Sequence, residues 1–551
     1  SSVAFPIKFN KLQLLIKLTM KSQLISNKKI KKINNLLKKF LENSDDLSPF
    51  IGLFPRIENF KSQIKIKASN YSNENRQILV RCLNRQYRHL SPDNFTLKQI
   101  NLISDSESFT VTTGHQLNLM GGPLFFIYKI ISVINLAHKL KVKYPKYNFI
   151  PVFWMATEDH DFKEINHFNF KGNCLKWPDN LSGPVGRYPT NGLKTTFQEF
   201  KSLIEDTPYG DLLKQIFESS YIFSENLGDA TRSFVHQLFG KDGLIVLDGD
   251  DVELKALFVS HMKDELTQRL CYKTVSKTNI SIKEINKNFK IQVKPRDINL
   301  FYMNDNFRER IVEKDGVFIV LNSQKKFKID ELIEELKNHP DRFSPNVLLR
   351  PLYQETVLPN LCYVGGDSEL LYWMQLKSYF ELSNVCYPII MRRNSNLILS
   401  SKHIKKLDQL SLCPSDLFLS PDDLTTKIIK KRLGKTIDFS SQKTYLKKQF
   451  EFIHKIAQNT DPSFKGAVSA QEKKQINGLI YLEKRLLNAQ KRKYKRLTED
   501  VLSLQSNLFP EGILQERFFN FSTFFAFYGD EFMDLLKEMN PFENGFYVIS
   551  L

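Results

Sequence analysis

The sequence has few cysteines and no two of them close together. Six occur among 551 residues, and no CxxC pair is present. This spacing argues against a disulfide scaffold and against a zinc site built from thiolates. A reducing compartment fits best, so we expect a cytoplasmic protein. The six are Cys82, Cys174, Cys271, Cys362, Cys386 and Cys413.

Long uncharged apolar runs are also missing. No stretch of about 18 such residues occurs, and we therefore expect no membrane span. The opening SSVAFPIKFNKLQLLIKLTMK lacks an initiator Met and interrupts its apolar residues with Lys, which indicates a trimmed or tagged terminus rather than a signal peptide. A composition of 42% hydrophobic and 25% charged residues is that of a folded protein.

Acidic charge is scarce relative to basic charge, and the formal net charge is +19. Such an excess is compatible with nucleic acid, with an anionic small molecule or with a lysine-rich proteome. The densest basic runs, at 28–32 and 491–496, have helical surroundings and no aromatic-rich RNA-binding signature. We interpret both runs as solvated helix faces and expect no nucleic-acid partner.

The chain from residue 108 has the pattern of an α/β protein. SFTVTT predicts a strand, LFFIYKIISVINLAHKL a helix and FIPVFWMA a second strand. The helix is apolar except for a narrow polar line that includes Lys129, and the second strand is a continuous apolar run, as in a parallel sheet covered on both faces. GLIVLDGDD, LCYVGG and YPIIMRR predict further core strands. A doubly wound parallel sheet follows.

The remaining segments predict additions to this core. The intervals 165–235 and 265–345 are too long for simple connections and are interpreted as inserted subdomains. The full set of predicted parts is a helical segment at 1–107, the core at 108–400, a connector at 401–440, a helical arm at 441–507 and a C-terminal segment at 508–551 that packs on the core.

The arm shows a heptad pattern. Apolar and polar residues alternate four and three apart at Ile476, Ile480, Glu483, Leu487, Gln490, Tyr494, Leu497, Val501 and Leu504. The same spacing at Leu446, Phe450, Ile453 and Ala457 precedes a break at Asp461-Pro462. We predict an antiparallel helical hairpin that also joins two copies of the chain into a homodimer.

No Walker loop, GxGxxG fingerprint or HExxH pattern is present, so candidate site residues come from the polar ends of the predicted strands. In TTGHQLNLMGGP, Gly114 permits a sharp turn, Gly121 and Gly122 permit close approach of a ligand, and Pro123 suits the first helical position. The free amides of the helix start would attract phosphate or carboxylate. The binding candidates of this turn are Thr113, Gly114, His115, Gln116, Asn118, Gly121 and Gly122.

A Gly-Pro turn with ordinary solvent contacts is the alternative. If the ligand interpretation holds, replacing Gly122 by Ala should weaken anion binding more than it disturbs folding, because alanine favours a helix. The affinity for the anion would then fall while the stability of the fold changed little.

The second strand ends in Glu158, Asp159, His160 and Asp161. Carboxylates beside an imidazole suit acid–base work, so Asp159, His160 and Asp161 are the catalytic candidates and Glu158 a binding residue. Two alternatives remain: a metal site formed by His160 with Glu164 and His167, and a satisfied hydrogen-bond network. We expect this segment and the 113–122 turn to share one pocket.

Two further segments contribute candidates. YVGGDSELLYW repeats the scheme of strand, glycine pair and helix, with Asp367 and Glu369 suited to an amine or a ribose hydroxyl, or simply to an ordinary helix start. Arginines after IIM and in LLRPLYQETVLP suit phosphate or carboxylate. The binding candidates here are Gly365, Gly366, Glu369, Trp373, Arg350, Arg392 and Arg393.

TTGHQLNLMGGPLFFIYKIISVI, VFWMATEDHDFKEIN, LLRPLYQETVLP, YVGGDSELLYWMQLK and LFPEGILQER together resemble the BshC family, the cysteine ligases of bacillithiol biosynthesis. The resemblance implies a Rossmann-like core with two connecting-peptide insertions, similar to class I aminoacyl-tRNA synthetases, and a coiled-coil arm associated with dimerisation. The sequence differs from the family pattern in two places. It has TGHQ where TGQQ is common, and GGDSE where a GGPGE-like run is common. His115 and Asp367 therefore leave the exact contacts open.

The implied activity is the addition of L-cysteine to glucosaminyl-malate in the last step of bacillithiol biosynthesis. A carboxylate does not acylate an amine without a better leaving group, so we expect activation by a nucleotide, ATP or ADP, as an adenylate or acyl phosphate. No metal is predicted. Asp159, His160 or Asp161 would accept the amine proton. A non-catalytic or partner-dependent nucleotide-binding assembly protein and a metal-dependent hydrolase remain alternatives.

Overall fold

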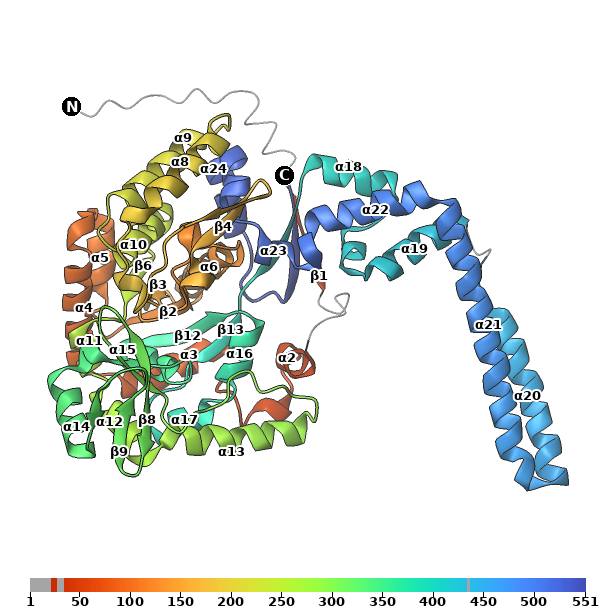
Figure 1. Cartoon of the computed structure of the whole chain (residues 1–551), viewed down its shortest axis with the longest axis horizontal. Coiled ribbons are helices and arrows are strands. Elements are labelled where there is room, and N and C mark those ends of the chain that lie inside the picture. The colour runs from red at the N-terminus through yellow and green to blue at the C-terminus, as the bar shows by residue number, and fades with distance from the viewer. Residues whose placement is uncertain (1–20, 27–33, 434–436) are drawn as a thin grey trace. The chain divides into compact units, whose positions relative to one another are not determined.

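The computed structural model describes residues 21–26, 34–433 and 437–551 (Figure 1). The chain divides into two compact units. The core unit comprises the described residues of Ile33–Ser395 together with Glu516–Gly545. The helical unit comprises Asn396–Gln515, Phe546–Leu551 and the strand at residues 21–26.

A five-stranded parallel sheet forms the centre of the core unit, and it confirms the predicted α/β class. Its spatial order is β13-β12-β2-β3-β6. The first strand along the chain, β2, is therefore central, and the chain crosses from one side of it to the other between β6 and β12. The bounds are β2 Ser108–His115, β3 Asn148–Met155, β6 Ile245–Asp248, β12 Asn360–Gly365 and β13 Ile389–Arg392.

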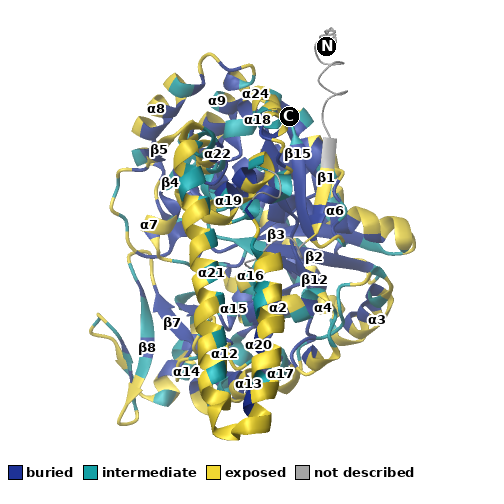
Figure 2. Ribbon diagram, turned by 90° about the vertical axis from the view of Figure 1, so that its right-hand side faces the viewer, coloured by how far each residue is buried: buried dark blue, intermediate teal, exposed yellow. Residues whose placement is uncertain are grey.

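Helices cover both faces of this sheet (Figure 1). Helix α6 (Phe125–Lys143) packs on β2 and β3, and helices α3 (Phe60–Asn70), α4 (Asn73–Gln86) and α5 (Asn94–Leu102) cover the other face. The strands are buried almost throughout, as Figure 2 shows in dark blue. This burial explains their continuous apolar runs.

The two long intervals contain secondary structure of their own. The first includes β4 (His167–Phe170), β5 (Asn173–Lys176), α8 (Lys194–Ile204), α9 (Gly210–Phe217) and most of α10 (Leu227–Phe239), and it follows α7 (Phe162–Ile165). The second includes the end of α12 (Val259–Gln268), α13 (Leu270–Ile285) and α14 (Ile329–Asn338), with α11 (Val252–Ala256) before it and α15 (Arg350–Val357) after it. It also holds an antiparallel sheet ordered β10-β9-β8-β7-β11. Those strands are β7 Leu300–Met303, β8 Arg308–Lys314, β9 Val317–Val320, β10 Lys326–Phe327 and β11 Phe343–Pro345.

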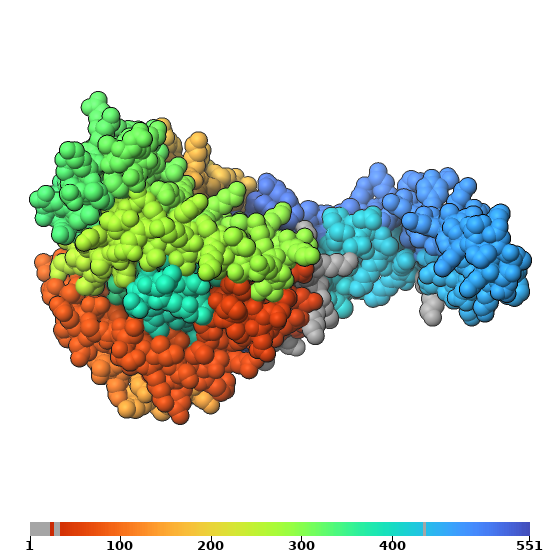
Figure 3. All heavy atoms as spheres, turned by 90° about the horizontal axis from the view of Figure 1, so that it is seen from below, coloured from red at the N-terminus to blue at the C-terminus, as the bar shows by residue number. Residues whose placement is uncertain are grey.

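Two short helices follow β12 and complete that side of the core unit. They are α16 (Asp367–Trp373) and α17 (Lys377–Leu382). Figure 3 shows α17 between α13 and the N-terminal helices, and α17 packs against α13. Helix α24 (Ser522–Lys537), in the C-terminal part of the core unit, packs against α6.

The helical unit contains a three-stranded sheet with the order β1-β15-β14. Its strands are β1 (Lys21–Ser26), β15 (Gly545–Ser550) and β14 (Ser395–Leu399). The prediction of a helical segment over 1–107 is therefore wrong at residues 21–26, because this stretch pairs with a strand from the far end of the chain. The opening residues 1–20 and the basic run 28–32 lie outside the described residues.

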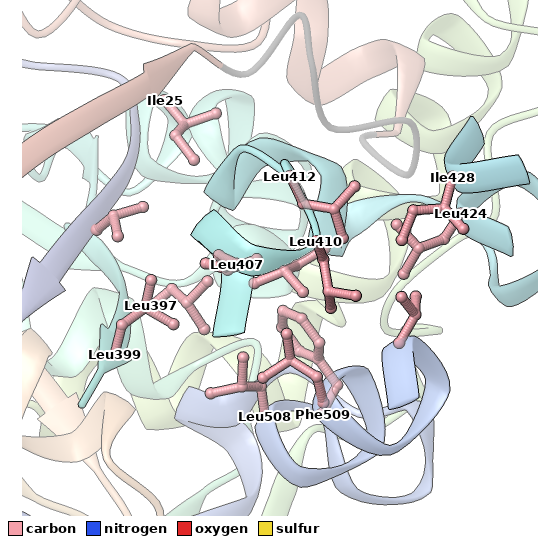
Figure 4. Packing of buried hydrophobic residues seen from close by; sticks show 14 of the residues in the cluster. Ile25, Leu397, Leu399, Leu407, Leu410, Leu412, Leu424, Ile428, Leu508 and Phe509 are labelled. Carbon is pink, nitrogen blue, oxygen red and sulfur yellow. The ribbon is translucent and has the colours of Figure 1, made fainter. Parts of the chain in front are cut away.

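A cluster of aliphatic side chains holds the helical unit together (Figure 4). Leu397 and Leu399 of β14 meet Leu407 of α18 (Ser401–Gln409), Leu424 of α19 (Pro421–Leu433) and Leu508 of α22 (Lys495–Leu508). The second basic run, at 491–496, lies where α21 passes into α22, and its Lys491 pairs with Asp422 of α19 at 2.8 Å.

The predicted helical hairpin is formed by α20 (Ser440–Thr460) and α21 (Lys465–Lys493). Ion pairs Lys443–Glu483 at 2.8 Å and His454–Glu472 at 3.2 Å fix an antiparallel register. Most of both helices is exposed, shown in yellow in Figure 2.

Two details of the predicted heptad seam are wrong. Ile480, which was predicted in the seam, is 47% exposed, whereas the neighbouring Leu479 is half-buried. The helix is also interrupted at Tyr494, so that Val501 and Leu504 belong to α22 and pack in the aliphatic cluster of the helical unit.

The described residues contain neither a candidate membrane span nor a disulfide. Across the described ranges, no helix combines the length and the apolar character that crossing a bilayer requires. All six cysteines are unpaired thiols, four of them buried and two, Cys174 and Cys413, exposed.

Candidate functional site: a cavity at the sheet's switch point

A cavity of about 580 Å³ opens at the carboxyl ends of β2 and β12 in the core unit. These are the two strands between which the chain changes direction across the sheet. In open parallel sheets ligands bind at this switch point. The volume is within the range of about 300–1,000 Å³ that is usual for small-molecule sites.

The floor of the cavity is an ion pair between α6 and α16. The Lys129 ammonium lies 2.7 Å from Glu369 Oε2 and also donates to the Gly114 carbonyl at 2.7 Å. Glu369 accepts from the Tyr363 hydroxyl at 2.6 Å and from the Gly366 amide at 2.8 Å. Burial alone would raise the pKa of Glu369, but Lys129 and the Gly366 amide outweigh it and lower the pKa. Lys129 and Glu369 therefore connect the end of β2, at Gly114, with the end of β12, at Gly366.

The turn after β2 presents two amide side chains to the cavity. Gln116 Nε2 donates to Asp159 Oδ2 at 2.5 Å, and Asn118 Nδ2 donates to the backbone carbonyl of Glu164 at 3.1 Å. Their oxygens, Gln116 Oε1 and Asn118 Oδ1, are buried without a hydrogen-bond partner in the described part of the chain. Buried polar atoms are normally satisfied, so both oxygens mark positions where a ligand could donate.

His115 lines the same turn as a neutral imidazole. Burial, together with the charge of Lys129, lowers its pKa to about 3. Nδ1 lies 3.0 Å from the Gln116 carbonyl, which can only accept, so Nδ1 carries the proton and Nε2 is left as an acceptor.

Residues 158–161 lie at the same sheet edge as the turn, but their side chains do not line the cavity. Glu158 is buried in an ion pair with Lys255 at 2.6 Å, and Asp161 caps α7 by accepting from the Glu164 amide. Only Asp159 connects the two segments, through its bond to Gln116. The expected shared edge is confirmed, and the expected shared cavity wall is wrong for these four side chains.

Asp159 and His160 are both engaged by arginines. Burial alone would raise the pKa of Asp159, but Arg350 at 3.6 Å and Arg308 bring it down to about 2. His160 Nδ1 lies 3.0 Å from Arg308 Nη1 and must accept from it, which leaves Nε2 protonated in the neutral ring. Burial and Arg308 lower the pKa of His160. The proton-accepting roles of Asp159, His160 and Asp161 stay predictions.

The metal interpretation finds no support in this geometry. Among residues 21–26, 34–433 and 437–551, no group of three His, Cys, Asp or Glu side chains is placed to hold a metal ion. His167 instead lies 3.2 Å from the Asn166 side-chain oxygen, and Glu164 turns to the cavity.

The arginines after β13 are already paired. Arg392 meets the Asp367 carboxylate at 2.5 and 3.2 Å, and Arg393 makes a bidentate pair with buried Glu516 at 2.6 and 3.0 Å. Arg392 does not line the cavity, whereas Arg393 does, and its Nε is buried without an acceptor in the described residues. Of the two predicted anion-binding arginines, Arg393 therefore lines the cavity, whereas Arg392 is engaged by Asp367 outside it.

The glycine pair serves the conformation of the turn. Gly121 and Gly122 have φ of +75° and +61°, values that glycine adopts readily and other residues rarely. A Cβ on Gly122 would lie 2.7 Å from the Asn118 Cβ, inside the protein rather than against a ligand. Helix α6 begins at Phe125, and the Leu124 amide already donates to the Phe519 carbonyl. The premise that alanine at position 122 would favour the helix is therefore wrong, because Gly122 lies before α6 with a positive φ, and the expected separation of affinity from stability stays a prediction.

Just over half of the predicted site residues meet at this cavity. Those in its wall are Gly114, His115, Gln116, Asn118, Gly122, Arg350, Gly366, Glu369, Trp373 and Arg393, with Asp367 beside them. Those outside it are Thr113, Gly121, Glu158, Asp159, His160, Asp161, Gly365 and Arg392. Thr113, for example, is fully buried and donates to the Val364 carbonyl at 2.7 Å, a link between strands.

Several wall residues were not predicted. Lys129 was visible only as part of the polar line on an apolar helix, and Tyr363 looked like an ordinary strand residue. Arg517 is the last residue of LFPEGILQER, a motif that supports the family resemblance but gave no indication of a binding role. It is exposed and forms no ion pair within the described residues, and its guanidinium lies 5.8 Å from the Phe125 ring centre.

Comparison with known families gives the cavity its context. Residues 20–394 match the model described as bacillithiol biosynthesis BshC, N-terminal Rossmann-like domain. Residues 396–551 match its C-terminal coiled-coil domain. The chain belongs to the BshC family. The expected resemblance and the Rossmann-like and coiled-coil architecture are thereby confirmed.

Curated BshC relatives cover nearly the whole chain. A Flavobacterium johnsoniae protein named "Putative cysteine ligase BshC" is 46% identical over 94% of this chain and 97% of its own length. A Christiangramia forsetii protein of the same name is 45% identical over 94% and 96%. A more distant one from Bacillus cereus is 30% identical over 85% and 89%.

Proposed function

We propose that this chain joins L-cysteine to glucosaminyl-malate through an amide bond, the last step of bacillithiol biosynthesis. Membership of the BshC family and the names of its relatives support the ligase class. The observation that carries the proposal is the cavity itself, in which unpaired acceptors, an unpaired arginine and aromatic rings line one space at the switch point. The six unpaired thiols suit the reducing cytoplasm proposed for it.

The cavity wall fits anionic substrates. Arg517 forms no ion pair among the described residues, and Arg393 keeps a buried Nε without an acceptor. Arg350 is held only loosely by Asp159, at 3.6 Å. Planar guanidinium groups bind carboxylate and phosphate in two-point contacts. These three arginines would therefore hold the malate carboxylates or the phosphates of a nucleotide.

ATP would supply the activation that cysteine's carboxyl group requires, and the same arginines would bind it. The chain's own residues bind and orient the substrates. Lys129 and Glu369 fix the floor, while Gln116 is held in place by Asp159, which stays ionised because its pKa is about 2. The rings of Phe125, Tyr363 and Trp373 reduce the water in the cavity.

The test is product formation by the purified full-length chain. Incubation with L-cysteine, glucosaminyl-malate and ATP should give bacillithiol, detected by mass spectrometry, and omission of any one component should abolish it. A chain that binds nucleotide but forms no product, with ATP or ADP, would be the assembly protein instead. Product loss on chelation together with hydrolysis of an added ester would favour a metal hydrolase.

A further inference from the structure

Two side-chain amides of the cavity wall have a fixed orientation, which determines where their oxygens lie. The amide group of Gln116 cannot be turned round, because its NH₂ faces the Asp159 carboxylate, which only accepts. The same holds for Asn118, whose NH₂ faces the Glu164 carbonyl. Gln116 Oε1 and Asn118 Oδ1 are thus obliged to be acceptors, and neither has a donor in the described chain. Asn118 is only 6% exposed and lines the cavity.

A carboxylate lines the same cavity as these oxygens. It is Glu164, whose side chain forms no ion pair among the described residues and whose backbone carbonyl accepts from Asn118. Partial burial, followed by the charges of Asp159 and Asp161, raises its pKa. A cation bound at Glu164 would gain from these negative charges, although Arg350 and Arg308 offset part of the charge of Asp159. His167, the nearest imidazole in the wall, is kept neutral because burial and Lys176 lower its pKa.

Two arginines of the cavity wall have the opposite character. Arg393 and Arg517 both approach the Phe125 ring, with guanidinium carbons 5.3 and 5.8 Å from its centre. Arg393 Nε is a buried donor without an acceptor in the described part of the chain. The wall therefore combines acceptors and a carboxylate at Gln116, Asn118 and Glu164 with donors at Arg393 and Arg517. Arg350, 3.6 Å from Asp159, adds a further cation.

We propose that Gln116, Asn118 and Glu164 form the subsite for the α-ammonium group of the amino-acid substrate. An ammonium carries three N–H donors, and these three side chains supply three acceptors, one of them charged. The sugar amine does not fit this subsite, because it must be uncharged to attack. The amino acid is thereby oriented with its carboxyl group toward Arg393 and Arg517. This inference rests on the proposed function, since it takes cysteine as the substrate.

The test removes the ammonium group and its subsite in turn. Calorimetric titration of the full-length chain compares L-cysteine with 3-mercaptopropionate, which lacks the amine, and with cysteamine, which lacks the carboxyl. We expect Asn118→Ala and Glu164→Gln to weaken L-cysteine and cysteamine about tenfold or more and to leave 3-mercaptopropionate nearly unchanged. Arg517→Ala should weaken L-cysteine and 3-mercaptopropionate but not cysteamine. Glu199→Gln, on exposed α8, is the matched loss of charge and should change nothing.

The possible outcomes distinguish failure of the proposed ammonium subsite from failure of the proposed ligase function. Equal weakening of L-cysteine and 3-mercaptopropionate by Asn118→Ala and Glu164→Gln, at unchanged melting temperature, overturns the subsite while cysteine remains the substrate. Weakening of ATP alone assigns the oxygens to the adenine amino group and also overturns it. A wild-type chain that binds none of the three thiols overturns the proposed function, and the subsite with it.

Discussion

Glu355 is a carboxylate enclosed in the core unit, 1% exposed. Burial, opposed only in part by Lys67 and by bonds from Asn360 and Gln354, raises its pKa to about 7. Between pH 4.5 and 7 the folded chain therefore binds this proton more tightly than the unfolded chain. The stability it contributes is complete below pH 4.5 and is lost as the pH rises through 7, by at most about 1.4 kcal/mol per pH unit.

Glu355→Gln should therefore flatten the fall of the unfolding free energy between pH 4.5 and 7, measured by urea denaturation. Glu265, whose pKa burial also raises to about 7, keeps part of the slope. Glu334→Gln on the exposed side of α14 is the matched control and should leave the slope unchanged. An identical slope in Glu355→Gln and wild type would show that Glu355 titrates as it does in water.

Gly122→Ala is predicted to destabilise the core unit. Its φ of +61° strains any residue with a Cβ, and that Cβ would meet Asn118 at 2.7 Å. We expect a loss of about 1–3 kcal/mol in thermal or urea unfolding. Gly478→Ala is the control, because it lies in helix α21 with open space around it and should stabilise by up to about 1 kcal/mol. Equal effects at both glycines would contradict the turn conformation.

For single residues, the sequence indicated where the site residues lie along the chain but not which side chains they contact. Glycines and polar residues after apolar runs located the turn and the 365–369 segment, because strand ends are where polar side chains are tolerated. The pairing of Arg392 with Asp367 and of Arg393 with Glu516 depends on segments that only the fold brings together. Arg517 was missed for the same reason.

At the scale of elements, Lys129 on α6 and Glu369 on α16 connect two helices through one ion pair, with side chains 5% and 22% exposed. Removing either partner leaves a buried charge without a counterion, at a cost of about 3–5 kcal/mol. Lys129→Met and Glu369→Gln should each destabilise strongly, and the double variant should cost clearly less than their sum. Additive losses in urea unfolding would show that the pair does not link the helices.

The helices and strands that were predicted best are those whose apolar residues follow a regular pattern along the sequence. Apolar runs located β3, β6, β12 and β13, because these strands are buried, and the β-branched residues of SFTVTT located β2. β1 was missed because its strand form depends on pairing with β15. The heptad pattern identified the hairpin, but exposed apolar residues beside the seam, such as Ile480, left its phase ambiguous.

For the whole molecule, we predict a homodimer formed through the hairpin of α20 and α21. Large apolar side chains outside its seam are exposed, including Phe452 at 67% and Tyr481 at 61%. Replacing residues 448–478 by a short Gly-Ser turn keeps the Lys443–Glu483 pair and the aliphatic cluster, which a deletion of 441–507 would damage. Sedimentation should show a dimer for wild type and a monomer for the shortened chain. The same subunit number in both would exclude the hairpin as the contact.

We predict that the substrates meet in the cavity between the ends of β2 and β12. A crystal structure of the full-length chain grown with L-cysteine and glucosaminyl-malate tests it directly. We predict electron density for both inside this cavity, with the cysteine nitrogen against Gln116, Asn118 and Glu164 and a carboxylate against Arg517. Well-defined density for either substrate at another site, with the cavity wall free of ligand, would contradict the account.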